Sequence, residues 1–215
     1  MARKQLIIFD WNGTLQDDLH YIYDCGVRRI FRHFNLTCPD MESYRRQVAA
    51  DFMGSFYWPN GIPADVTAMD LNAIMKAGIR ENSSQPALFP YARETIVRLS
   101  DLQVALAVVS GFDTDILLEA IHRNCLAEHL IEVHGSADSK APVFAGVIDR
   151  FGCRPDEVAC IGDTVEDAQA AAEVGALPLA VTNGFHYRER LEAAKPTVPG
   201  MIIIDSLSDV LSHLD

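Results

Sequence analysis

Two short hydrophobic runs that each lead into an aspartate constrain the fold of this chain more than any other feature. Residues 6–9 read Leu-Ile-Ile-Phe and are followed by Asp10. Residues 158–161 read Val-Ala-Cys-Ile and are followed by Gly162 and Asp163. Unbroken apolar runs of this length are typical of strands buried on both faces of a parallel sheet, and such sheets bind ligands at the carboxyl ends of their strands. We therefore expect the two aspartates to meet at one edge of a sheet.

Further apolar runs alternate with helical patterns, which predicts an α/β fold with a doubly wound parallel sheet. The six expected strands are Leu6–Phe9, Val104–Val109, Leu130–Val133, Val158–Ile161, Leu177–Val181 and Met201–Ile204. The helices expected between them are Tyr91–Leu102, Thr114–Asn124, Ala141–Phe151 and Glu166–Val174, with Gly175 as the C-cap of the last.

The stretch between the first two strands has a different pattern. It predicts three helices, Leu19–Phe34, Met41–Phe52 and Ala64–Arg80. We therefore expect a core of residues 1–16 and 89–215 and an inserted helical cap of residues 17–88 that covers the strand ends as a lid.

The cap carries an aromatic run from Phe52 to Trp58. This run is expected to form the core of the cap, and one wall of a substrate pocket is the alternative. His186 and Tyr187, which follow the fifth strand, are near the expected site and receive no role.

Composition narrows the classes of partner. The chain has 215 residues, 49% of them hydrophobic, and a net charge of −12 without a basic block, so neither nucleic acid nor a membrane surface is an expected partner. A small anionic substrate stays possible because a local cation can outweigh the overall charge. The sequence has five cysteines without a C-x-x-C pair, no signal peptide and no apolar run of about 18 residues, which favours a cytoplasmic protein. We expect a monomer or homodimer.

The segment after the first strand reads Asp10-Trp11-Asn12-Gly13-Thr14. A carboxylate at a strand end can act as a nucleophile and form a covalent phosphoaspartate. The alternative is a β-hairpin, because Asn-Gly is a strong hairpin signal. The next segment has a helical pattern instead of an alternating one, and both interpretations stay open for this segment taken alone.

Asp163 and Asp167 lie four residues apart after a strand. Mg²⁺ prefers hard oxygen ligands and keeps several waters, so a few acids suffice to hold it. The alternative is helix capping, since Asp163 or Thr164 ahead of Glu166 is a common helix start.

Two further segments carry polar groups at expected strand ends. Ser110 and Gly111 follow the strand Val104–Val109, where a hydroxyl and a backbone N–H would hold a phosphate. A plain turn is the alternative. Lys140 opens a helix, where the helix dipole disfavours a cation, so it is a candidate for a task beyond that of a surface lysine.

Taken in order, the segments Asp-x-Asn-Gly-Thr, Ser-Gly, Lys and Gly-Asp-x-x-x-Asp resemble the motifs of the haloacid dehalogenase-like hydrolase superfamily, most closely its phosphoglycolate-phosphatase-like branch. The resemblance covers the whole chain, including a helical insertion placed like the cap of that branch. It implies a Rossmann-like core, Mg²⁺ as cofactor, and hydrolysis of a small phosphorylated substrate through an aspartyl-phosphate.

The resemblance also implies residue roles. Asp10 matches the nucleophile, Ser110 and the following Gly111 match the phosphate-binding segment, and Lys140 matches the lysine that neutralises nucleophile and phosphate.

The metal ligands follow from the same resemblance. Asp163 matches a metal ligand, Asp167 matches an acid that binds or orients the metal shell, and the position of Asn12 matches a residue that offers its backbone carbonyl to the metal.

Asn12 departs from the family pattern, which normally has a second aspartate at this position. That aspartate protonates the leaving oxygen and then activates water, and an amide can do neither. We therefore expect weak turnover, a substrate with a good leaving group, or a different acid. Glu166, Asp17 and Asp18 are nearby in sequence.

Three alternatives follow from this departure. A metal-independent dehalogenase needs no proton for its leaving halide, but such enzymes lack a metal-binding acid like Asp163. A catalytically weak binding or regulatory protein with the same fold is the second. A phosphomutase is disfavoured because it needs the acid–base group twice.

Overall fold

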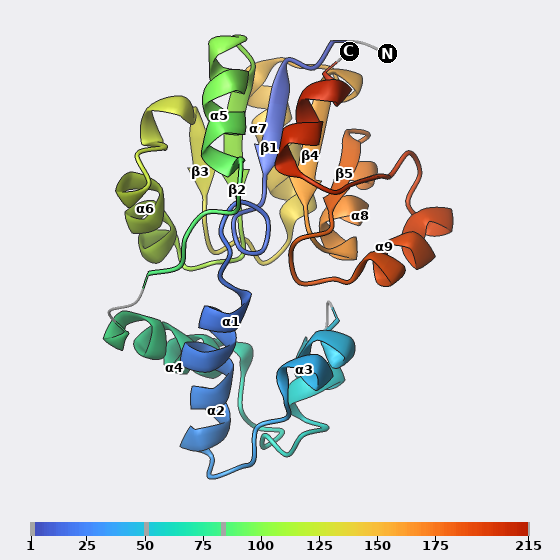
Figure 1. Cartoon of the computed structure of the whole chain (residues 1–215). Coiled ribbons are helices and arrows are strands. Elements are labelled where there is room, and N and C mark those ends of the chain that lie inside the picture. Colours follow the sequence, from blue (N-terminus) through green and yellow to red (C-terminus); the bar gives the residue numbers. More distant parts are fainter. Residues whose placement is uncertain (1–2, 50–51, 83–84, 215) are drawn as a thin grey trace. The chain divides into compact units, whose positions relative to one another are not determined.

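The structure is a computed structural model that describes residues 3–49, 52–82 and 85–214. It divides into two compact units, Met1–Asp17 with Ala87–Asp215 and the intervening Asp18–Pro86. The first unit contains a parallel sheet with helices on both faces, and the second is built of helices (Figure 1).

The sheet has six strands in the order β3-β2-β1-β4-β5-β6, and every neighbouring pair is parallel. The strands are β1 (Leu6–Phe9), β2 (Ala105–Val109), β3 (Glu132–His134), β4 (Val158–Gly162), β5 (Leu177–Val181) and β6 (Ile202–Ile204). This is the order of doubly wound dinucleotide-binding sheets. In these sheets the strands are added first on one side of β1 and then on the other, so the strand order reverses between the two central strands. The predicted α/β fold is thus confirmed, and the reversal lies between β1 and β4.

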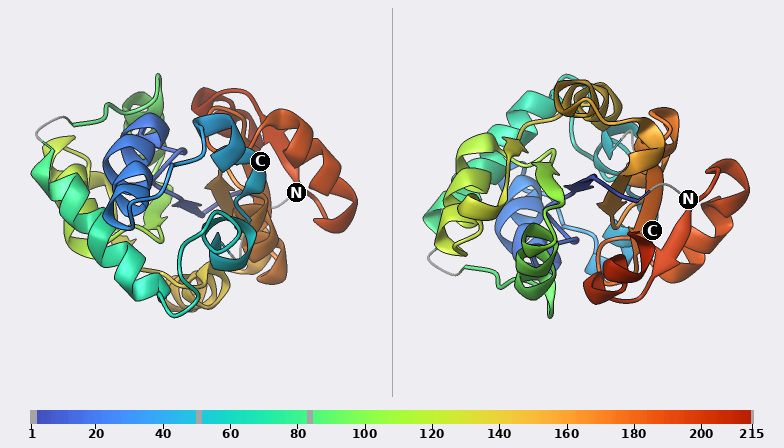
Figure 2. Two further views of the ribbon diagram at one scale, coloured as in Figure 1. Left: turned by 90° about the horizontal axis from the view of Figure 1, so that it is seen from below. Right: turned by 90° about the horizontal axis from the view of Figure 1, so that it is seen from above.

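Both faces of the central strand are buried, which explains its unbroken apolar sequence. Ile7 and Phe9 contribute to a core that also contains residues of α5 (Ala92–Asp101) and α6 (Thr114–Arg123). Leu6 and Ile8 point to the other face, where α7 (Lys140–Phe151) and α8 (Val165–Glu173) cover the sheet. Figure 2 shows these helical layers along the sheet from below and above.

The remaining helical elements of this unit were not predicted. They are α9 (Arg188–Ala194), short 3₁₀ turns at Ala127–His129, Pro155–Glu157 and Lys195–Thr197, and the 3₁₀ segment Leu207–His213. The predicted strand Leu130–Val133 begins later, at Glu132, since Leu130 and Ile131 connect the 3₁₀ turn Ala127–His129 to β3. Gly175 follows α8 with φ of 74°, as expected for a helix C-cap.

The second unit contains α1 (Leu19–Ile22), a π-helical segment Tyr23–Val27, α2 (Arg28–His33), α3 (Met41–Gln47), a π-helical segment Met53–Tyr57 and α4 (Ala68–Glu81). The predicted helix Met41–Phe52 is wrong beyond Gln47, since Val48 adopts an extended conformation; residues 50 and 51 lie outside the described chain. The predicted start of the last helix at Ala64 is also wrong, because Thr67 caps α4 by accepting a hydrogen bond from Asp70 N.

The aromatic run of this unit belongs largely to its hydrophobic core. Met53, Phe56 and Tyr57 are buried together with residues of α2 and α4, whereas Trp58 is 44% exposed. The interpretation as cap core is confirmed for these three residues, and any contact with substrate stays a prediction.

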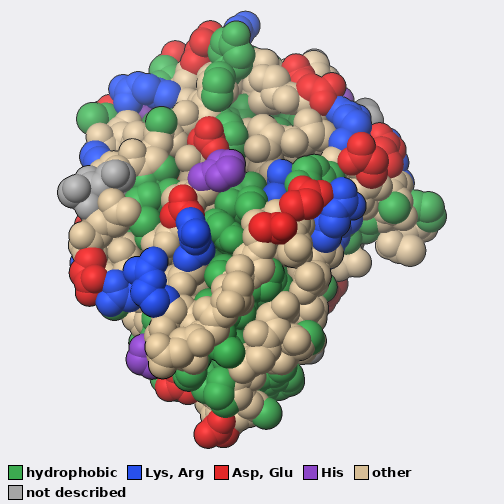
Figure 3. Space-filling view, turned by 60° about the horizontal axis from the view of Figure 1, so that its bottom comes forward, with side chains coloured by type: hydrophobic (Ala, Val, Ile, Leu, Met, Phe, Trp, Pro, Cys, Tyr) green, Lys and Arg blue, Asp and Glu red, His purple; other side chains and the backbone are tan. Residues whose placement is uncertain are grey.

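Two further observations concern the surface charge and the lengths of the helices. On the face drawn in Figure 3, Lys and Arg side chains lie in small groups among Asp and Glu side chains. Within the described residues, every helix is too short or too polar to pass through a lipid bilayer.

Candidate active site

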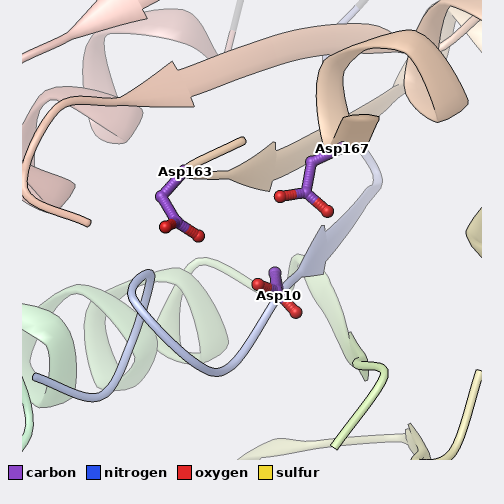
Figure 4. Close-up of side chains that lie close together, drawn as sticks. All are labelled: Asp10, Asp163 and Asp167. Atoms are coloured by element: carbon purple, nitrogen blue, oxygen red, sulfur yellow. The ribbon is translucent and has the colours of Figure 1, made fainter. Parts of the chain in front are cut away.

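Three aspartate side chains meet at the carboxyl ends of β1 and β4. Asp10, Asp163 and Asp167 each place a carboxylate oxygen within 4.8 Å of the others, and Figure 4 shows the three groups around a common space. Their exposed fractions are 7%, 1% and 5%. Buried like charges are costly unless a cation or hydrogen-bond donors compensate them. This cluster is therefore a candidate binding site for a cation.

Strand register explains why residues so distant in sequence meet. Phe9 of β1 pairs with Ile161 of β4, and the N–H of Asp10 donates to the carbonyl of Ile161 at 2.8 Å. Asp163 lies just beyond the end of β4 on the neighbouring strand. The expectation that Asp10 and Asp163 share one edge of the sheet agrees with this geometry.

Lys140 is the cation of the cluster. Its Nζ lies 2.8 Å from Asp10 Oδ1 and also donates to Asp167 Oδ1. Burial by itself lowers the pKa of Lys140, but the two carboxylates outweigh it and raise the pKa above its ordinary value. The lysine stays charged at the first residue of α7, where the helix dipole alone would disfavour it.

Asp10 and Asp163 are harder to ionise than isolated carboxyls. Burial raises the pKa of Asp10 to about 6; the ammonium of Lys140 opposes this shift, and the carboxylate of Asp167 adds to it. Burial, followed by repulsion from Asp10 and Asp167, raises the pKa of Asp163 well above its usual range. A cation bound among these oxygens would favour their ionised forms.

Asp163 is held from two sides. Thr14 Oγ1 donates to Asp163 Oδ1 at 2.9 Å, and the backbone N–H of Phe185 donates to Asp163 Oδ2 at 2.5 Å. A Cβ atom at Gly13 or at Gly184 would overlap this carboxylate, and Gly13 also has φ of 71°. The sequence therefore needs glycine at both positions for the loops to approach Asp163.

Asp167 is held by the start of α8. Thr164 is the N-cap, its Oγ1 accepts from Asp167 N at 3.2 Å, and both Thr164 Oγ1 and Thr164 N donate to Asp167 Oδ2 at 2.6 and 3.1 Å. The helix-capping alternative is confirmed for Thr164. Because Asp167 Oδ1 faces Lys140 at the same time, capping and membership of the cluster are compatible.

The loop after β1 is not a hairpin. Its strand pairs with β2 and β4 in parallel, and the N–H groups of Leu15 and Gln16 turn back to the carbonyl of Trp11 at 2.9 and 3.0 Å. The hairpin interpretation of Asn12-Gly13 is therefore wrong. The compact turn keeps the chain near the carboxyl end of β1.

Asn12 and Ser110 contact each other across the ends of β1 and β2. Ser110 Oγ donates to Asn12 Oδ1 at 3.2 Å, and Ser110 Oγ accepts from the N–H of Phe112 at 3.2 Å. Ser110 is 2% exposed, whereas the following Gly111 is exposed. The hydroxyl, the amide and the exposed turn lie at the same edge of the sheet as Asp10.

The donor set of the cluster fits a hard divalent cation. Mg²⁺ prefers carboxylate and carbonyl oxygens together with waters. Within the described residues, Asp10 Oδ1 is one of two buried side-chain oxygens without a well-aligned hydrogen bond, and Lys140 Nζ contacts it as an ion pair at 2.8 Å. When all three acids are ionised, they also outnumber the one lysine, so a bound cation would compensate the excess negative charge. These observations favour Asp10 and Asp163 as cation ligands.

Sequence reasoning missed the residues that support the acids. They are Thr14, Gly184 and the backbone of Phe185, whereas Thr164 is among the predicted helix-start residues. A capping-box pattern, Thr164 followed three residues later by Asp167, was a readable signal. The loop after β5 gave none, because a backbone N–H has no sequence signature. Glu166, one of the acids that are nearby in sequence, lies 3.8 Å from His186 Nδ1 and 4.0 Å from Arg190.

Comparison with known proteins agrees with the motifs. Residues 7–181 match the profile of the haloacid dehalogenase-like hydrolase family. A phosphoglycolate phosphatase from Aliivibrio fischeri is 26% identical over 90% of this chain and 91% of its own length. One from Pectobacterium atrosepticum is 27% identical over 60% of this chain, and the match spans about half of that relative, 55%.

Solved structures show the same fold. A haloacid dehalogenase-like family hydrolase from Streptococcus pneumoniae superposes with a TM-score of 0.81 at 21% identity, and both chains are covered completely. A predicted phosphoglycolate phosphatase from Haemophilus somnus gives 0.82 at 20% identity, again over 100% of both chains. With the family profile spanning most of the sequence, these findings show that the chain belongs to the haloacid dehalogenase-like hydrolase family.

Proposed function

We propose that this chain is a Mg²⁺-dependent phosphate monoester hydrolase that acts on a small phosphorylated metabolite through an aspartyl-phosphate. The observation that carries the proposal is the buried cluster of Asp10, Asp163 and Asp167 around Lys140. Relatives described as phosphoglycolate phosphatases support a phosphate ester as substrate and make phosphoglycolate the first compound to test.

The nucleophilic step is assigned to Asp10. A carboxylate oxygen of Asp10 forms a bond to phosphorus while the bond from phosphorus to the ester oxygen breaks. Water then attacks the phosphorus and the Asp10 carboxylate is released. One proton of the water stays on the phosphate, and the other replaces, through solvent, the proton that the departing alkoxide takes up. Lys140 neutralises Asp10 and the incoming phosphoryl oxygens, and the Ser110 hydroxyl with the N–H of Gly111 binds a phosphoryl oxygen.

The cation site is assigned to the carboxylates of Asp10 and Asp163 and the backbone carbonyl of Asn12. Bound Mg²⁺ supplies positive charge to the phosphoryl oxygens. Asp167 has both oxygens engaged by Lys140 and Thr164, which favours the role of orienting Lys140 and the metal's water shell.

The side chain of Asn12 limits the leaving groups. An amide donates hydrogen bonds but has no proton to transfer, and a lost general acid typically costs about 10²–10⁴-fold in rate. We therefore expect low turnover on alkyl phosphates and better turnover on esters or anhydrides whose leaving group is a weak base.

The alternatives are a metal-independent dehalogenase-type hydrolase and a binding protein. Asn12 favours both, since neither needs an acid at this position. The buried metal-type acids argue against the dehalogenase, and the retained nucleophile, serine and lysine argue against the binder. Activity that survives complete chelation would favour the dehalogenase. Absence of phosphoryl transfer to Asp10 from acetyl phosphate, measured by intact mass, would favour the binder.

The deciding experiment is a phosphate-release screen over small phosphate esters, with and without Mg²⁺. We expect activity that needs Mg²⁺, is abolished by Asp10→Asn and rises in Asn12→Asp by up to about 10²-fold. Asn12→Ala is the matched control, because it removes the amide without adding an acid. No gain in Asn12→Asp would mean that this position does not face the leaving group.

A further inference from the structure

His186 is buried beside the site, and the proposed chemistry does not use it. The residue lies in the loop between β5 and α9, and its exposed fraction is 2%. The ring nitrogens of a buried imidazole nearly always have hydrogen-bond partners. Its partners therefore indicate what the residue does.

The imidazole accepts a hydrogen bond from the start of α8. Val165 N donates to His186 Nδ1 at 3.0 Å. Val165 is the first residue of α8, and its N–H is one of those that a helix start leaves without an intrahelical partner. In this contact Nδ1 is the acceptor, and Glu166 Oε2 lies 3.8 Å from the same nitrogen.

The residue before His186 holds the proposed metal ligand. Phe185 N donates to Asp163 Oδ2 at 2.5 Å, and Gly184 packs so closely that a Cβ atom there would overlap the same carboxylate. The loop after β5 therefore approaches Asp163 by its backbone and Val165 by its imidazole.

These contacts close a ring. From Asp163 the chain runs through Thr164 to Val165, crosses to His186 by one hydrogen bond, and returns from Phe185 to Asp163 by another. Two hydrogen bonds thus connect two loops that are joined to different strands, β4 and β5. Loss of the His186 bond removes one of these two hydrogen bonds, and the Asp163 carboxylate gains freedom to turn.

We propose that His186 is a positioning residue that orients the Asp163 carboxylate for cation binding by fixing the loop after β5 to the start of α8. The inference rests on the proposed function, because it takes Asp163 as a ligand of Mg²⁺. Mg²⁺ demands near-octahedral geometry, so a rotated carboxylate binds it less well. Loss of groups that orient a ligand typically weakens metal affinity by about 10–100-fold.

The test compares Mg²⁺ binding by calorimetry in the wild type and in three variants of His186. His186→Leu fills the space without an acceptor, and His186→Gln is polar but extends its acceptor beyond the position of Nδ1. His186→Asn offers an amide oxygen near that position. We expect Leu and Gln to weaken Mg²⁺ binding about tenfold or more and Asn to recover most of the loss.

A second measurement separates positioning from folding. Leu99→Ala, on α5 and fully buried, is the control that lowers stability without touching the loop. We expect it to lower the unfolding temperature and to leave the Mg²⁺ affinity unchanged. In phosphate-release assays, the His186 variants should need more Mg²⁺ for half-maximal activity and approach the wild-type rate at saturating Mg²⁺. Should His186→Leu not fold, the contrast between Gln and Asn carries the same information.

Each outcome bears on the proposal. Wild-type affinity in His186→Leu and His186→Gln would overturn the inference and leave the proposed function standing. An equal loss in all three variants and in Leu99→Ala would mean a merely structural role and would also overturn it. A wild-type protein that binds no Mg²⁺ would overturn both the inference and the proposed metal site.

Discussion

The two ends of α7 carry cations in opposite environments. Lys140, at the first residue, has a side chain that is 19% exposed and faces Asp10 and Asp167. Arg150, in the last turn, has a side chain that is 51% exposed and donates to both carboxylate oxygens of Glu132 on β3. The helix dipole favours a cation at the second end and disfavours one at the first.

The difference separates stability from function. At the Arg150 end, an exposed cation pairs with Glu132, whose side chain is 21% exposed, so the charges balance and less free energy depends on them. At the Lys140 end, three buried acids, Asp10, Asp163 and Asp167, exceed the one lysine. A buried excess of like charge is retained where a ligand compensates it, and such sites commonly reduce stability in return for activity.

The largest effect is expected from removing each cation of α7 in turn. Lys140→Met leaves buried carboxylates without their cation and should cost about 3–5 kcal/mol in the free energy of unfolding. Arg150→Met, the matched change at the exposed end, should cost much less, because an exposed cation contributes little to stability. Urea unfolding monitored by circular dichroism measures both values. Equal losses at the two ends would refute the contrast drawn here.

A smaller effect is expected from Mg²⁺ on stability. If the ion binds the folded acid cluster, Mg²⁺ at about 100 times its dissociation constant should add about 2.7 kcal/mol to the free energy of unfolding. The gain should disappear with EDTA and in Asp163→Asn, and persist in Glu132→Gln at the exposed end. Differential scanning calorimetry with Ca²⁺ and Mg²⁺ in parallel would show whether any divalent ion suffices. A gain that persists in Asp163→Asn would place the ion elsewhere.

The smallest effect concerns the pH dependence at the Arg150 end. The hydrogen bond from Arg150 lowers the pKa of Glu132 to about 2. A carboxyl with a lowered pKa in the folded state stabilises the protein above its unfolded pKa, about 4.3, and loses this contribution as the pH falls toward 2. The stability difference between wild type and Glu132→Gln should therefore be largest at neutral pH and vanish in that window. Urea titrations at several pH values would detect a constant difference, which would contradict the assignment.

The sheet was predictable because its strands are continuously apolar. Runs such as Leu6–Phe9 and Leu177–Val181 match the observed strands residue for residue, since burial on both faces admits only hydrophobic side chains there. The predicted helix Met41–Phe52 is too long. Its apolar residues do pack into the core of the helical unit, but the helix ends at Gln47 and the chain is extended at Val48. Apolar periodicity marks burial, and it does not mark where a helix ends.

The acids and Lys140 were predictable because charged groups at the ends of apolar strands and at a helix start are unusual. Their supporting groups were less so. Thr14 holds Asp163 across two strands, and Phe185 does so with a backbone N–H that any residue but proline possesses.

By itself, the sequence determined the class of fold, the residues that line the carboxyl edge of the sheet and the absence of an acid at Asn12, since hydrophobic pattern and side-chain chemistry are local properties. Only the tertiary structure decided that Asp10 and Asp163 meet, that Lys140 joins Asp10 to Asp167, and that His186 reaches the start of α8. The physical reason is strand order: β1, β4 and β5 are neighbours through backbone hydrogen bonds, which no single segment encodes.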